Sequence, residues 1–119
     1  MLLNLSNHPL STWTDEQVKA AQEQYGEVVD LPFPQVSPEA TPNDIQRLAE
    51  EYLSKIQTIG SPEQVAVHLM GELNLTFALV SLLKANGYTC VASTTERVVK
   101  ELDNHQKLAE FHFVQFRKY

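Results

Sequence analysis

Residues 64–92, QVAVHLMGELNLTFALVSLLKANGYTCVA, contain the pattern that decides the fold. The short apolar run over 64–70 predicts a strand that is buried on both faces. An apolar stretch over 72–86 follows and ends before Gly87, the residue type that most often terminates helices. This helix is apolar on nearly all sides, so we expect neighbours to cover it on two sides. Residues 88–92 predict a second strand, and the order strand, helix, strand predicts a right-handed crossover between parallel strands.

The same alternation of strand and helix occurs on the N-terminal side of this stretch. The expected elements are a strand over 1–5, a helix from Thr14 to Tyr25, a strand over 27–31 and a helix from Pro42 to about residue 59. Thr14 and Thr41 are typical helix N-caps, and Gly26 and Gly60 stand where the two helices should end. Four prolines between residues 32 and 42 indicate a stiff, extended connection.

The C-terminal side of the chain has a different pattern. Ser93, Thr94 and Thr95 are expected to form a polar turn after the strand over 88–92. Residues 96–102 and 107–118 alternate in polarity around a polar tetrapeptide and predict an antiparallel hairpin. The elements together predict one domain over 1–119 with an α/β fold. We expect a Rossmann-like three-layer sandwich, with a mostly parallel sheet and a C-terminal antiparallel β-hairpin at one edge.

Composition excludes several classes of function. The chain has 119 residues, of which 43% are hydrophobic and 20% charged, and a net charge of −6, which opposes binding to long DNA, long RNA or an anionic membrane. The longest apolar run, Phe77–Val80, is far too short to span a bilayer, and the start of the chain lacks the features of a signal peptide. We therefore expect a cytoplasmic protein. The single cysteine, Cys90, excludes an internal disulfide and is expected to be a buried apolar group.

A candidate ligand site follows from the expected sheet, because open parallel sheets bind ligands beyond the carboxyl ends of their strands. Three segments follow those ends and offer hydroxyls, amides, carboxylates, one imidazole and one guanidinium. An anionic, hydrogen-bonding ligand such as a phosphate compound suits this set. The candidate residues are Ser6, Asn7, His8, Gly71, Glu72, Asn74, Thr76, Ser93, Thr94, Thr95, Glu96 and Arg97.

Other site chemistries lack their sequence signatures. The chain contains neither a dinucleotide-binding G-x-G-x-x-G nor a P-loop, and it has no G-x-S-x-G nucleophile elbow. We expect no metal and no cofactor, because the histidines show no paired spacing. These are His8, His68, His105 and His112.

Several candidates also have a purely structural interpretation. His8 could orient or deprotonate a nucleophile, or it could bond only its own loop. Glu72 could contact a ligand or favour the start of the following helix. Thr94 and Thr95 could simply form a turn, and Arg97 could pair with surface carboxylates rather than with a phosphate. His68, within a strand, is expected to be a buried core histidine.

The chain resembles the short CRISPR-associated accessory proteins of type III systems, which are Rossmann-like (CARF-like) relatives of the ring nucleases. The resemblance runs over the whole length and rests on short motifs, of which the T-T-E-R-x-V turn and the F-R-x-Y terminus discriminate best. The motifs are Asn7-His8-x-Leu10, T-x-E-Q at 14–17, Gly71 before an apolar helix with Thr76, residues 93–99 and residues 113–119.

The resemblance implies a homodimer that binds cyclic tetra-adenylate across its paired carboxyl edges. It also implies metal-independent cleavage, in which a ribose 2′-hydroxyl attacks its own 3′-phosphate and so switches off an antiviral signal. In this hypothesis His8 would position or deprotonate the 2′-hydroxyl, Glu72 is the other candidate for activating it, and Arg97 would stabilise the phosphate. Asn7, Thr94 and Thr95 would hold phosphate or ribose, and Glu72 or Asn74 would contact adenine or sugar.

Two other functions remain open at this stage. A module that binds a cyclic nucleotide without cutting it would use the same pocket. A structural interaction protein would instead dock a partner through the apolar helix over 72–86.

Overall fold

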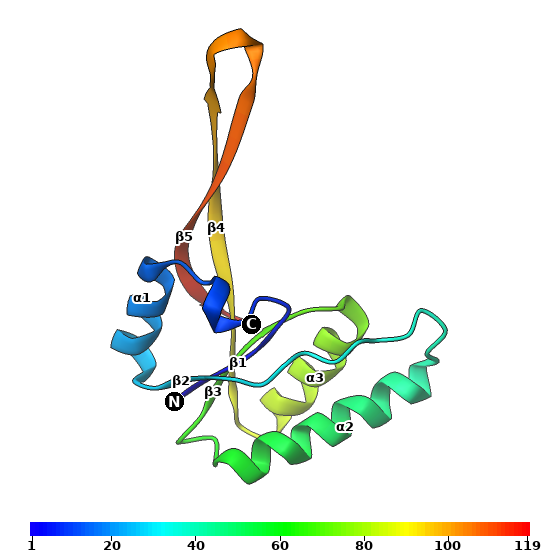
Figure 1. The fold of residues 1–119 in the computed structure, drawn as a ribbon. Coiled ribbons are helices and arrows are strands. Elements are labelled where there is room, and N and C mark those ends of the chain that lie inside the picture. Colours follow the sequence, from blue (N-terminus) through cyan, green and yellow to red (C-terminus); the bar gives the residue numbers. More distant parts are fainter.

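The computed structural model describes residues 1–119 as a five-stranded sheet with three α-helices (Figure 1). The strands are β1 (Leu2–Ser6), β2 (Val28–Asp30), β3 (Ala66–Met70), β4 (Thr89–Glu101) and β5 (Lys107–Lys118), and the helices are α1 (Asp15–Tyr25), α2 (Pro42–Ile59) and α3 (Leu73–Ala85). The strand order is β2-β1-β3-β4-β5, parallel except for the antiparallel pair of β4 and β5. The predicted fold class, with its C-terminal hairpin at one edge, is confirmed.

The sheet separates two apolar cores, because successive side chains of a strand point to opposite faces. Helix α1 covers one face, and α2 and α3 lie side by side on the other (Figure 1). Leu3 and Leu5 of β1 pack in the core below α2 and α3, whereas Leu2 packs with Trp13 and Phe116 on the α1 side. Cys90 is buried in the larger core, as expected, and burial raises the pKa of its thiol to about 11.

The helix boundaries follow the predicted capping residues. The hydroxyl of Thr14 accepts the amide of Gln17, and Gly26 ends α1 with a φ of 81°, a left-handed conformation that favours glycine. Thr41 and Asp44 form a complete capping box at the start of α2. None of the three α-helices is both long and apolar enough to cross a lipid bilayer.

Helix α3 departs from expectation on its outer side. The sheet and α2 cover much of it, but Leu73 is 82% exposed and Phe77 is 77% exposed. The expected cover of this apolar helix is therefore incomplete within one chain.

The predicted polar turn at residues 93–95 is wrong. Strand β4 runs without a break from Thr89 to Glu101, and β5 pairs with it from Val91 outward, with one register shift between Thr94 and Thr95. Threonine favours extended backbone, and β5 supplies the ladder of hydrogen bonds that a turn would have interrupted. The reversal comes only at the 3₁₀ turn Asp103–His105, as the hairpin pattern predicts.

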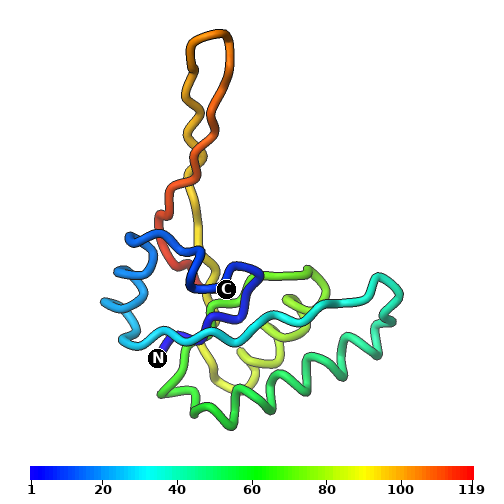
Figure 2. Tube along the Cα trace, in the orientation of Figure 1, coloured from blue at the N-terminus to red at the C-terminus, as the bar shows by residue number.

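The outer parts of β4 and β5 form a two-stranded arm that stands away from the body (Figures 1 and 2). Val91 is the last residue of β4 that pairs with β3, so β4 continues for ten more residues beyond the carboxyl edge of the parallel strands. At about 3.3 Å per residue, the arm reaches roughly 33 Å from that edge. We refer to residues 95–113 as the arm and to the remainder of the chain as the body.

Candidate functional site

A row of hydrogen-bonded polar side chains crosses three neighbouring strands near the carboxyl edge. Asn4 of β1 lies in register with Asp30 of β2 and His68 of β3. Its Nδ2 donates to Asp30 Oδ1 at 2.8 Å, and its Oδ1 lies 2.8 Å from His68 Nδ1. Because an amide oxygen can only accept, His68 carries its proton on Nδ1. Asn4 is thus the centre of a polar row that joins β2, β1 and β3.

This polar row fixes the β1 loop, which we define as residues 7–10. The Ser6 hydroxyl donates to Asn4 Oδ1 at 2.8 Å and accepts the amide of His8 at 3.1 Å. The carbonyl of His8 accepts from Asn4 Nδ2 and from Trp13 Nε1, both at 2.9 Å. Ser6 is buried and committed to these bonds, so it supports the loop from below.

Two further bonds attach the β1 loop to its neighbours. The Asn7 amide donates to the Met70 carbonyl at the end of β3, and the Leu10 amide donates to the Asp30 carboxylate. The side chains of Asn7 and His8 are exposed, and neither takes part in a hydrogen bond. The loop therefore presents a free amide and a free imidazole from a fixed backbone.

His68 is a buried core histidine, as expected from its place within a strand. Its ring lies edge-on to Trp13 at 5.1 Å and to Phe116 at 5.6 Å between centroids, and its Nε2 has no hydrogen-bond partner. Burial, followed by the charge of nearby His8, lowers the pKa of His68 to about 4. The ring is therefore neutral at pH 7, and its Nδ1–H donates to Asn4 within the polar row.

This shift predicts an acid-sensitive fold. The folded pKa of about 4 lies below the ordinary value of 6.5, so the unfolded chain binds the proton more tightly. Stability should be complete above pH 6.5 and fall by about 3 kcal/mol as the pH drops towards 4. Urea unfolding at a series of pH values measures this loss. In His68→Met, the free energy of unfolding should depend less steeply on pH between about 4 and 6.5. An unchanged dependence would mean that other groups cause the loss of stability.

Three adjoining hollows follow the carboxyl edge, and we call them together the edge groove. The largest has a volume of about 880 Å³ and the two others about 350 and 310 Å³. Glu72 borders the first and second, and Asn7 and Gln35 border the second and third. The lining holds amides, hydroxyls and the carboxylates of Asp30 and Glu72, but no lysine, arginine or histidine.

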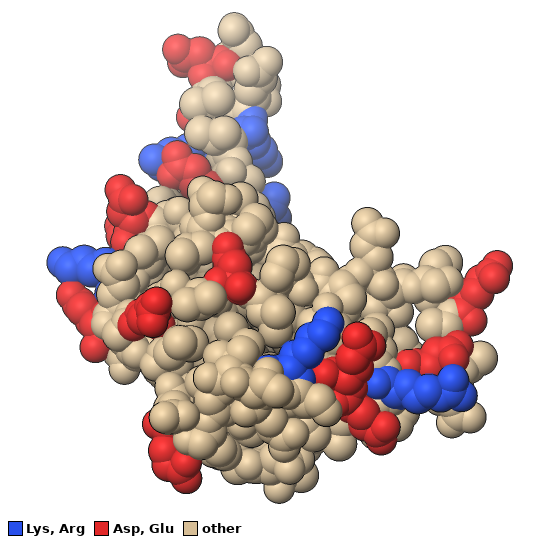
Figure 3. Space-filling view, turned by 60° about the horizontal axis from the view of Figure 1, so that its bottom comes forward, with Lys and Arg blue, Asp and Glu red and all other residues tan.

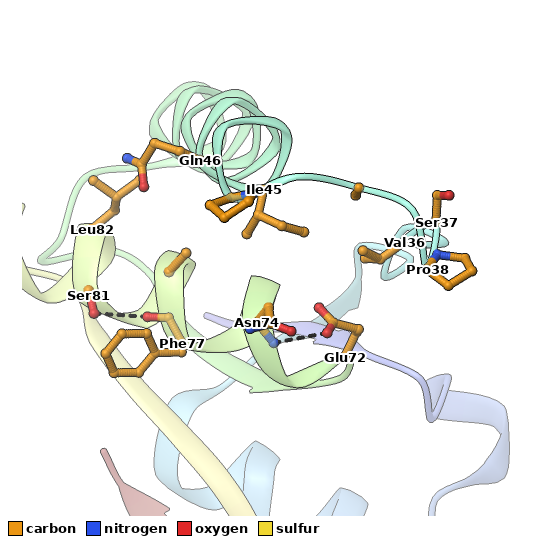
Figure 4. Close-up of a pocket in the computed structure, with 13 residues that line it drawn as sticks. Val36, Ser37, Pro38, Ile45, Gln46, Glu72, Asn74, Phe77, Ser81 and Leu82 are labelled. Atoms are coloured by element: carbon orange, nitrogen blue, oxygen red, sulfur yellow. Dashed lines mark hydrogen bonds between the residues drawn. The ribbon is translucent and has the colours of Figure 1, made fainter.

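The largest hollow lies between α2, α3 and the proline-rich connection (Figure 4). Asn74, Phe77 and Ser81 line it from α3, and Gln46 lines it from α2. An exposed aromatic ring beside amide groups can stack on a planar base while the amides bond its edge. This part of the groove suits a purine.

Glu72 has the structural role that its position before a helix indicates. Its two carboxylate oxygens accept the amides of Asn74 and Leu75 at 3.0 and 2.8 Å, which caps α3. The carboxylate therefore occupies the helix N-terminus that could otherwise hold a phosphate. Thr76, one turn further on, has a buried hydroxyl without a hydrogen-bond partner.

Gly71 makes room for the ring of Phe33 from the proline-rich connection. A Cβ at position 71 would collide with that ring, which borders two hollows of the groove. Gly71→Ala should therefore destabilise the fold by about 1–3 kcal/mol in urea unfolding. The cost should shrink in a Phe33→Leu background, where the smaller side chain can yield. An equal cost in both backgrounds would contradict this contact.

The remaining sequence-predicted residues lie along β4 and not at a turn. Ser93 stays at the edge, where its hydroxyl lies 3.2 Å from Met70 Sδ. Arg97 is exposed on the arm, six residues beyond Val91 and so about 20 Å from the edge. It lies opposite Phe111 on β5 and forms no ion pair. Thr94, Thr95 and Glu96 lie between these two positions, on β4. One chain therefore does not bring Arg97 to the β1 loop.

Arg117 is the edge cation that the sequence-based list lacks. It pairs with Ala92 of β4, one residue beyond the last pair of β3 with β4. Since Phe116 packs on the α1 side, Arg117 points to the face that α3 covers. It is exposed, and its guanidinium has no carboxylate partner.

Charge is unevenly divided between the two ends of the chain. Residues 1–92 hold eleven acidic and four basic side chains, whereas residues 93–119 hold four acidic and five basic ones. On the face drawn in Figure 3, the carboxylates are spread over several parts of the body. No three His, Cys, Asp or Glu side chains lie close enough together to hold a metal ion.

The chain is a small α/β domain with a mostly parallel sheet, and the edge groove lies at the carboxyl ends of its parallel strands. The chain belongs to the family described as the uncharacterized protein MJ1673 family, whose model matches residues 1–117. No curated protein and no solved structure matches the chain.

Proposed function

We propose that the chain binds cyclic oligoadenylate, in the form of cyclic tetra-adenylate, along the edge groove and opens the ring. The observation that supports this best is the fixed β1 loop, which holds the free side chain of Asn7 at the groove and that of His8 beside it. Preorganised polar groups bind and orient a ligand with little loss of conformational freedom. The type III CRISPR resemblance supplies the identity of the ligand.

Each part of the ligand has a matching part of the site. Adenine would stack on Phe77 and bond the amides of Asn74 and Gln46, and Asn7 would bond ribose. A phosphate would meet Arg117, because the groove lining itself holds no cation. The two carboxylates of the groove are already engaged, Asp30 by Asn4 and Glu72 by the start of α3.

Ring opening needs one group that accepts a proton. His8 would take the proton of a ribose 2′-hydroxyl while that oxygen forms a bond to its own 3′-phosphorus. The bond from phosphorus to the 5′-oxygen of the next nucleotide breaks, and that oxygen takes up a proton. The products are a 2′,3′-cyclic phosphate and a 5′-hydroxyl, without a metal ion. In this proposal the protein acts in the cytoplasm, where it would end a type III antiviral signal.

Binding without cleavage is the second candidate, and one observation favours it. His8 is exposed beside the edge groove but does not border any of its three hollows. A ligand seated deep in the groove would then lie out of reach of the imidazole.

A single experiment separates these candidates. Purified protein is incubated with cyclic tetra-adenylate in excess EDTA, and the products are resolved by chromatography. Linear products with a 2′,3′-cyclic phosphate are expected. If the ring stays intact but binds the protein, the chain is a binding module that does not cut its ligand. If the ring stays intact and does not bind, both proposed functions are refuted.

Arg117 provides a quantitative check of the phosphate contact. Arg117→Ala should lower affinity for cyclic tetra-adenylate by about 1.5–3 kcal/mol, the value of a hydrogen bond to a charged group. Isothermal titration calorimetry measures the change, and Arg47→Ala on the exposed side of α2 is the matched control. Equal affinities for the two variants would remove Arg117 from the site.

A further inference from the structure

The arm has one apolar face that nothing in the chain covers. On β4 it carries Thr95, Arg97, Val99 and Glu101, and directly opposite them on β5 it carries Phe113, Phe111, Ala109 and Lys107. We call these eight residues the apolar face. Phe111 is 63% exposed and Val99 is 49% exposed, even though Phe113 at the base packs against the core.

On the opposite face of the arm, charged side chains of the same arm pair with one another. Glu110 there lies 3.2 Å from Lys100 Nζ and 3.1 Å from His112 Nε2. The hydrogen bond from Lys100 is the main cause that lowers the pKa of Glu110. This charged face needs no partner, whereas an isolated two-stranded ribbon with a bare apolar face is only marginally stable in water. The arm therefore lacks a covering element on one defined side.

We propose that the apolar face docks on the same face of a second copy of this chain. Its charges are self-complementary about Val99, because Arg97 lies two residues before it and Glu101 two residues after it. The two-fold axis of this pair lies between the two stacked faces, level with Val99 and perpendicular to the strands. The two arms therefore run in opposite directions. Arg97 of each copy then meets Glu101 of the other, and Val99 meets Val99.

Arg97 and Glu101 cannot form an ion pair with each other within one arm. Arg97 and Glu101 are four residues apart on one strand, which is about 13 Å. In the stacked pair, Lys107 would also lie over the Phe111 ring of the other copy, a favourable cation–π contact.

Net charge also favours an interface on the arm over one on the body. Two bodies, each with an excess of five acidic residues, repel one another more strongly than two arms (residues 95–113), each with an excess of one acidic residue. At about 800 Å² for 20–30 residues a side, eight residues from each copy bury roughly 400–650 Å² in total, less than the ~1,000 Å² of a stable specific interface. The dimer should therefore dissociate on dilution through the micromolar range. This proposal is independent of any ligand.

Sedimentation equilibrium of the ligand-free protein tests the interface. The wild-type chain should reach the mass of two copies at high micromolar concentration. Val99→Lys should raise the dimer dissociation constant about tenfold or more, as for a central interface residue. Leu108→Lys is the matched control on the charged face, where Leu108 is 43% exposed, and should leave it unchanged.

A charge exchange decides whether the partner is the same face of another copy. Arg97→Glu and Glu101→Arg should each weaken the dimer, and the double variant should restore it, since the pair is re-formed with reversed charges. A double variant that remains monomeric would overturn the stacked arrangement. A wild-type chain that stays monomeric, or an equal loss in Leu108→Lys, would overturn the interface itself. Circular dichroism of each variant checks that these exposed substitutions leave the fold intact.

Discussion

Replacing Asn4 by alanine is expected to remove about 3–5 kcal/mol of stability, a large part of the 5–15 kcal/mol typical of a domain. The substitution leaves a cavity in the centre of the sheet. It also leaves the Nδ1–H of His68 without its buried acceptor, whereas the Ser6 hydroxyl keeps the His8 carbonyl within 3.1 Å. Buried donors that lose their partner cost the full desolvation of the group, so the effect should exceed that of a single surface hydrogen bond.

Urea unfolding followed by circular dichroism measures this loss. Asn43→Ala is the matched control, because Asn43 is exposed in the first turn of α2 and should change stability by less than about 0.5 kcal/mol. A loss below about 1 kcal/mol in Asn4→Ala would show that the polar row contributes little to the fold.

Replacing His8 by alanine is expected to slow ring opening by about 10²–10⁴-fold, the usual contribution of a positioned general base. Affinity for the ring should change far less, because Asn7, Phe77 and Arg117 would still bind it. The β1 loop should keep its shape, since only the carbonyl and amide of His8 hold it.

Single-turnover cleavage and calorimetry, performed on the same preparations, separate the two effects. His112→Ala on the charged face of the arm is the control imidazole and should cleave at the wild-type rate. Equal losses of rate and affinity in His8→Ala would make His8 a binding residue. An unchanged rate would exclude it from catalysis.

Sequence patterns predicted the order of the elements well, because the relevant signals are local. Thr41 and Gly60 enclose α2, and the alternation of strand and helix allows essentially one sheet direction. The error at Ser93–Thr95 has a non-local cause. Three small polar residues suggest a turn on their own, and only the pairing partner β5 keeps them extended.

The candidate site was predicted in part. Two of the three expected segments, the β1 loop and the start of α3, do meet at the edge groove. Arg97 does not, because its position depended on the turn that is absent. Arg117 occupies the edge instead, since β5 runs antiparallel and brings the C-terminus back to the sheet.

The polar row had a sequence signal that local patterns alone could not interpret. Asn4 and Ser6 alternate with leucines in a strand whose other residues are apolar, and His68 interrupts a second such strand. Buried polar residues in strands require partners, but the register that aligns Asp30, Asn4 and His68 comes only from the three-dimensional structure.

Titration of cyclic tetra-adenylate into the protein by calorimetry tests the central claim most directly. We predict saturable binding that weakens in both Asn7→Ala and Arg117→Ala, with adenosine monophosphate bound more weakly than the ring. The absence of a binding heat at high ligand concentration, or full affinity in both variants, would contradict the assignment of the edge groove as a cyclic oligoadenylate site.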